Sequence, residues 1–77
     1  MDYKYLVFSS VTYGLRGMSV LEKAGIPTRL EKIKHIPSLG GCGYALAVQN
    51  LHFQQALDTI YASGFKVIEI LESKDGL

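Results

Sequence analysis

The chain has 77 residues, of which 48% are hydrophobic and 19% charged, a composition that predicts one small folded domain and excludes a disordered chain. Its net charge of +1 is too small to favour nucleic acid as a partner, because phosphate binding requires an accumulation of Lys and Arg. The uncharged stretch of residues 36–53 is interrupted by Pro37 and several glycines, so we expect no membrane-spanning helix and no membrane partner. The N-terminus has no signal-peptide pattern, which makes the cytoplasm the expected location.

The first half of the chain predicts a strand, a helix and a second strand. Residues 4–8 favour a strand, and the alternation of its side chains places Leu6 and Phe8 on one face. The other face carries Tyr3, Tyr5 and Val7. Apolar residues recur at helical spacing over 11–24, and Ser9, Ser10 or Thr12 could provide the N-cap. The polar residues 28–34 then suit a strand at the edge of a sheet.

The second half repeats the order of strand, helix and strand. After a loop at 35–41, the uncharged residues 43–48 predict a central strand, and Asn50 is expected to cap a helix that ends near residue 63. Residues 65–71 predict a last strand, followed by a polar tail at 72–77. We therefore expect a single α+β domain over 1–77, with its core in about 3–71. The order of elements is that of the ferredoxin-like βαββαβ sandwich, with an antiparallel sheet of strand order 4-1-3-2 and both helices on one face.

The uncovered face of that sheet suggests a dimer. It would display Tyr3, Tyr5 and Val7, an apolar surface that water alone covers poorly, so we expect a second copy to bury it. Stacking of RNA bases on Tyr3, Tyr5 and Tyr44 is the alternative, but the aromatic signature of RNA-binding domains is absent from the third strand.

Cys42 is the only cysteine, and it lies in the stretch Gly40-Gly41-Cys42-Gly43. A lone cysteine forms no internal disulfide, which suits a reducing compartment and leaves the thiol free. Gly41 and Gly43 would let a partner approach the main chain closely. The alternative is a small residue, partly buried at the start of a strand, because free cysteine is often buried.

The expected topology places Cys42 at the same end of the sheet as the start of the first helix. Ser9, Ser10, Thr12 and the free backbone amides there could stabilise a thiolate and lower the pKa of the cysteine. His35 should share this end, so a Cys–His pair is a further possibility.

His52 should lie at the opposite end of the sheet from Cys42 and His35. This separation argues against a metal site built from the three residues, and we expect neither a metal nor a cofactor.

Basic residues on the second strand have two interpretations. Lys32 and Lys34 share a face and could steer an acidic partner toward the thiol, with Arg29 nearby. Alternatively, they are the charges with which an edge strand resists aggregation.

The chain resembles a family of small selenium/sulfur carrier-like proteins over about residues 5–71. The resemblance rests on YLVFSS before a helix, on LEKAGIP at its end, on Cys42-Gly43 followed by YALAV, and on ASGF at the end of the second helix. Ser38 stands where relatives have a serine-rich approach to the cysteine, whereas an arginine of that approach has no counterpart here.

This resemblance implies a carrier without turnover of its own. Cys42 would accept a sulfur or selenium atom from a donor enzyme, such as a cysteine desulfurase, and pass it to an acceptor protein as a persulfide or selenosulfide. A lone exposed thiol suits that transfer, since a second cysteine would discharge the persulfide as a disulfide. The competing hypothesis is a dimeric regulatory or partner-binding module in which the cysteine is incidental.

Overall fold

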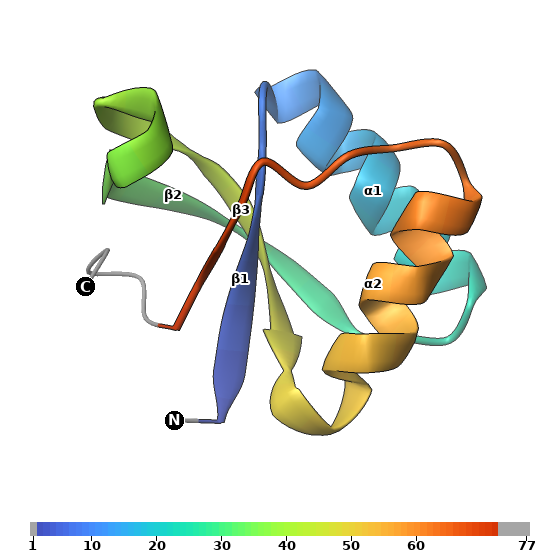
Figure 1. Ribbon diagram of the computed structural model, residues 1–77. Coiled ribbons are helices and arrows are strands. Elements are labelled where there is room, and N and C mark those ends of the chain that lie inside the picture. The colour runs from blue at the N-terminus through green and yellow to red at the C-terminus, as the bar shows by residue number, and fades with distance from the viewer. Residues whose placement is uncertain (1, 73–77) are drawn as a thin grey trace.

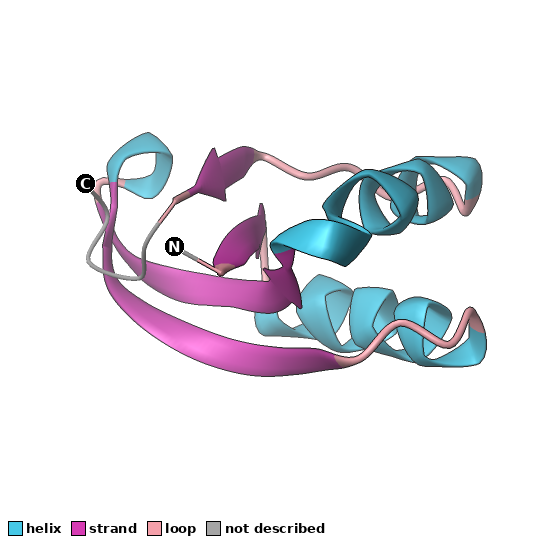
Figure 2. Cartoon of the chain, turned by 90° about the horizontal axis from the view of Figure 1, so that it is seen from below, coloured by secondary structure: helices cyan, strands magenta, loops and turns pink. Residues whose placement is uncertain are grey.

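Four antiparallel strands form one sheet in the order β2-β3-β1-β4, and two α-helices lie against one face of it (Figures 1 and 2). The computed structural model describes residues 2–72. The elements are β1 (Tyr3–Phe8), α1 (Val11–Lys23), β2 (Thr28–Ile36), the 3-10 turn η1 (Pro37–Leu39), β3 (Gly41–Gln49), the 3-10 turn η2 (Asn50–His52), α2 (Phe53–Ala62) and β4 (Glu69–Leu71). The predicted ferredoxin-like α+β arrangement and its strand order are confirmed.

Several boundaries differ from the predicted ones. The strands β2 and β3 are longer than expected because their pairing continues to Ile36 and Gly41, so the predicted loop at 35–41 shrinks to η1 and Gly40. Asn50 begins η2 and does not cap α2, which follows His52 without a side-chain cap. Strand β4 is shorter than the predicted 65–71, since residues 65–68 are not part of a strand. Of the predicted tail, residues 73–77 lie outside the described residues.

The central strand β1 supplies side chains to both faces of the sheet, as its alternation predicts. Leu6 and Phe8 face the helices, where they join a buried core. The other members of this core are Leu21, Ile26, Leu46, Val48, Ala56 and Ile60. Burial of these side chains holds α1 and α2 on the sheet.

The opposite face of the sheet carries a second buried cluster. Tyr5 and Val7, which were expected to be exposed, are only 8% and 0% exposed in the single chain. They pack with Ile33, Ile36, Ala45, Ala47 and Leu71. The prediction of an open apolar surface on this face is therefore wrong. The dimer stays a prediction, but this face gives no argument for it, nor does it offer a platform of exposed tyrosines for RNA.

The end of the β2–β3 hairpin covers this second cluster by bending across the face that lacks helices (Figure 2). The turn η1 thereby arrives beside β4, the edge strand farthest from β2 in the sheet. The backbone N–H of Ser38 donates to Oε1 of Glu69 at 2.9 Å. Hydrogen bonds from the Ser38 side chain and backbone hold the pKa of Glu69 below its usual 4.5, and the charge of His35 acts in the same direction.

We expect this hydrogen bond to make folding stability depend on pH. Above pH 4.5 the Glu69 carboxyl is ionised in the folded and the unfolded chain, and its contribution is fully present. As the pH falls below 4.5, the unfolded chain takes up the proton first, so stability decreases until the folded carboxyl is protonated too. Urea denaturation of the wild type and of Glu69→Gln between pH 7 and about pH 3 measures the difference.

The Glu69→Gln variant should be less stable than the wild type at pH 7, and the two should converge at acid pH. Glu72→Gln is the matched control, because Glu72 pairs only through an exposed 3.4 Å contact with Lys4. An equal gap between Glu69→Gln and the wild type at all pH values would contradict the interpretation.

Candidate functional site

Cys42 is the second residue of β3 and its side chain is exposed. The sequence predicted that Cys42 lies between a loop at 35–41 and a strand at 43–48, but β3 already begins at Gly41. Exposure excludes the alternative of a buried residue at the start of a strand. The thiol is therefore accessible to a partner while the main chain around it is paired in a sheet.

A β-bulge lies directly opposite Cys42 on the neighbouring strand. Ile33 pairs with Gly43 and Ile36 with Gly41, so the two residues between them, Lys34 and His35, oppose the single residue Cys42. Both are exposed. The structure thus confirms that His35 and Cys42 share one end of the domain, although His35 belongs to β2 and no hydrogen bond joins the two side chains.

The glycines around the thiol have different roles. Gly40 has a φ of +68°, a left-handed conformation that favours glycine, and it closes the turn with a hydrogen bond from its N–H to the Ile36 carbonyl oxygen. A Cβ at Gly43 would lie 2.6 Å from Leu39 Cδ1 and 2.8 Å from Ile36 Cδ1. Gly43 therefore makes room for η1 to fold over the second cluster. A Cβ would meet no atom within 4 Å at Gly40 or at Gly41, so of the two glycines expected to give access to the thiol, Gly41 and Gly43, only Gly41 has open space beside it.

Ser38 and the start of α1 were also predicted to lie at the thiol. The Ser38 N–H instead donates to Glu69, so it is not available to an anion beside Cys42. Ser10 is the N-cap of α1, and its Oγ accepts a 3.2 Å hydrogen bond from the N–H of Tyr13. No hydrogen bond joins Cys42 to Ser9, Ser10 or Thr12, and Figures 1 and 2 show η1 well apart from the start of α1. Support of the thiol by these amides stays a prediction.

The basic residues of β2 are not equivalent. The Cζ atom of Arg29 lies 4.9 Å from the centroid of the Tyr3 ring, and its Nε lies 3.1 Å from Oε2 of Glu31. The charge of Arg29 is therefore already engaged. Lys32 and Lys34 are exposed. Strand β2 lies at an edge of the sheet, as predicted. Of its lysines, Lys34 is the one that the bulge places opposite the thiol.

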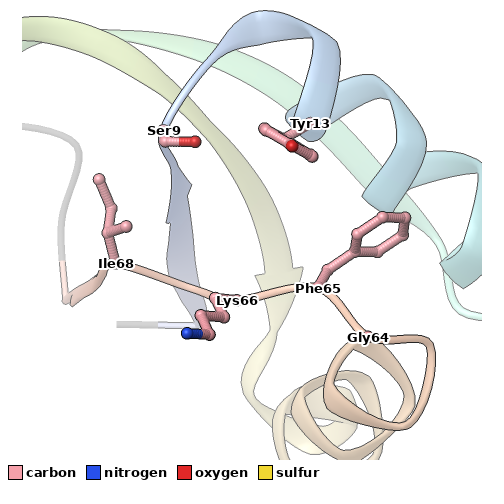
Figure 3. Close-up of a pocket in the computed structure, with 6 residues that line it drawn as sticks. All are labelled: Ser9, Tyr13, Gly64, Phe65, Lys66 and Ile68. Carbon is pink, nitrogen blue, oxygen red and sulfur yellow. The ribbon is translucent and has the colours of Figure 1, made fainter.

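A groove beside the start of α1 was missed from the sequence. It has a volume of about 310 Å³ and is lined by Ser9, Tyr13, Gly64, Phe65, Lys66 and Ile68 (Figure 3). Its two walls are about fifty residues apart in the chain, so no pattern of neighbouring residues in the sequence predicts the groove. The sequence itself offered only a tyrosine in the first turn of one helix and a phenylalanine just after the other.

Comparison of the chain with protein-family models, curated proteins and solved structures finds no match. The resemblance to selenium/sulfur carrier-like proteins therefore stays a prediction. None of the helices within residues 2–72 is long and apolar enough to cross a membrane. The described side chains include no cluster of three or more His, Cys, Asp or Glu residues, and His52 lies in η2, beyond the end of β3 opposite to Cys42.

Substitution of each of the two glycines that flank Cys42 tests whether Gly43, but not Gly41, is needed for packing. Gly43→Ala should destabilise the fold by about 1–3 kcal/mol, because Leu39 can move aside but the fully buried Ile36 has little room to do so. Gly41→Ala meets no neighbouring atom and should change stability by no more than about 0.5 kcal/mol. Chemical denaturation measures both, and equal losses would contradict the packing role of Gly43.

Lys34 should attract negatively charged reagents to the thiol. We expect Lys34→Gln to slow the reaction of Cys42 with an anionic aromatic disulfide about two- to fivefold at low salt, and less at high salt. The reaction with neutral iodoacetamide should not change. Lys23→Gln, at the far end of α1, is the matched control. Equal slowing of both reagents, or the same effect from Lys23→Gln, would show that Lys34 does not steer.

Proposed function

We propose that the protein carries a single sulfur or selenium atom on Cys42. The observation that supports this function best is the exposure of the chain's only thiol, on a strand whose backbone is held by pairing with β2. A thiol that serves only to fill a core is buried, whereas a thiol that exchanges atoms with a partner must be reachable by the partner's reacting atom.

The transfer needs no cofactor and no net oxidation. The Cys42 thiolate attacks the outer sulfur of a persulfide on the donor enzyme. A new S–S bond forms, the S–S bond of the donor breaks, and the donor cysteine leaves as a thiolate. In the second step a nucleophile on the acceptor attacks the outer atom, and Cys42 leaves as a thiolate. Selenium follows the same course through a selenosulfide.

The surroundings of the thiol suit this cargo. Lys34 and His35 lie opposite Cys42 across the bulge, where a positive charge would attract an anionic persulfide. With one cysteine in the whole chain, no internal thiol can attack the persulfide and release the cargo as sulfide. A cysteine desulfurase is the class of donor that supplies such an atom.

A second candidate function is a binding module in which Cys42 is incidental. The groove between Tyr13 and Phe65 favours it, because partly exposed aromatic walls can hold a ligand. The thiol and the groove can be tested separately.

Intact-mass spectrometry tests the carrier function. After incubation with a cysteine desulfurase and L-cysteine, the wild-type protein should gain the mass of one sulfur atom, and dithiothreitol should remove it. Cys42→Ser should gain nothing and should keep the fold of the wild type, because the exchanged atom is exposed.

The carrier function would be overturned if the wild type gains no sulfur or selenium and its thiol alkylates no faster than free cysteine at neutral pH. Unfolding of Cys42→Ser would show instead that the thiol contributes to packing. Circular dichroism of the variant distinguishes these results.

A further inference from the structure

The groove beside the start of α1 has the size and the lining of a small-molecule site. Its volume of about 310 Å³ is at the lower end of the range of ligand pockets, about 300–1,000 Å³. One side comes from the end of β1 and the first turn of α1, and the other from the segment that leads from α2 to β4 (Figure 3). Contacts between Tyr13 and Phe65 bridge the two sides.

Tyr13, Phe65 and Ile68 supply the apolar part of the groove's lining. The rings of Tyr13 and Phe65 meet edge to face, with centroids 6.4 Å apart and an angle of 64° between their planes. Tyr13 is 47% exposed and Ile68 39% exposed, so both side chains have accessible surface that a ligand can contact. An aromatic body placed against these side chains would bury apolar surface that now faces water.

The polar side chains that line the groove are the hydroxyls of Ser9 and Tyr13, which can donate or accept, and the ammonium of Lys66, with no acid among the lining residues. Lys66 lies at the edge of the groove, where its side chain points away from Ser9 and Tyr13 in the view of Figure 3, and it forms no ion pair with any residue between 2 and 72. Its ammonium is carried on a flexible stem that a bound anion can order. Ser9 directs its hydroxyl toward the Tyr13 side of the groove (Figure 3). The first turn of α1 also lacks acidic side chains.

We propose that this groove binds a small carboxylate with an aromatic body, the ring against Tyr13, Phe65 and Ile68 and the carboxylate at Ser9 and Lys66. The charge of the lining selects an anion, and the limited volume selects a free small molecule over a folded segment of a partner. This site is independent of the carrier function, because Cys42 is not among the residues that line it.

Titration of the whole ¹⁵N-labelled chain with 3-phenylpropionate tests the proposal by NMR. The amide signals of Ser9, Gly64 and Phe65 should shift and saturate, with a dissociation constant on the order of a millimolar for a ligand of this size. The uncharged 3-phenylpropanamide should bind at least about threefold more weakly, because it lacks the charge that Lys66 attracts. Cys42→Ser should bind 3-phenylpropionate like the wild type, whether or not the thiol carries sulfur.

Two variants assign the contacts. Tyr13→Ala should weaken binding about tenfold by removing one wall, and the variant should keep its fold because Tyr13 is exposed. Lys66→Met should abolish the preference for the acid over the amide, whereas the control Lys23→Met, at the other end of α1, should preserve it.

Three results would overturn the proposal: no saturable shift with 3-phenylpropionate, equal affinity for the acid and the amide, or identical behaviour of Lys66→Met and Lys23→Met. A short peptide that ends in phenylalanine serves as the last arm of the experiment. If it binds more tightly than 3-phenylpropionate, the occupant is a protein C-terminus and the assignment to a free small molecule is wrong.

Discussion

The burial of β1 on both faces of the sheet is the constraint on which the rest of the structure depends. Residues 5–8 are all buried, with Leu6 and Phe8 toward the helices and Tyr5 and Val7 away from them. Two helices can cover only one face, so the chain must cover the other by different means. It does so with the end of the β2–β3 hairpin, which bends over Tyr5 and Val7 and is held to β4 by the hydrogen bond from Ser38 to Glu69.

The position of the thiol follows from this bend. The bulge at Lys34 and His35 strengthens the local twist of the hairpin, and Cys42 is the residue opposite it. Gly43 leaves the space that Leu39 and Ile36 fill on the buried side, while Cys42, next to it in the strand, is exposed. The same segment of backbone therefore both covers the second cluster and exposes the thiol.

The thiol and the groove are two separate candidate sites in the molecule. Cys42 lies on the β2–β3 hairpin beside basic residues, whereas the groove lies between α1 and the segment before β4. A persulfide transfer needs only the first, and an aromatic carboxylate needs only the second. Because no residue belongs to both, a substitution in either part can be interpreted without reference to the other.

The sequence by itself determined the order of the elements, the two faces of β1, the span of α1 to within about one residue, and the uniqueness of Cys42. These depend on residues a few positions apart, whose periodicity and capping chemistry are local. Only the tertiary structure decided that Tyr5 and Val7 are covered, that Ser38 reaches Glu69, and that Tyr13 meets Phe65. Those contacts join residues about thirty or more positions apart, or depend on how far a hairpin bends, which the alternation of residues along a strand does not encode.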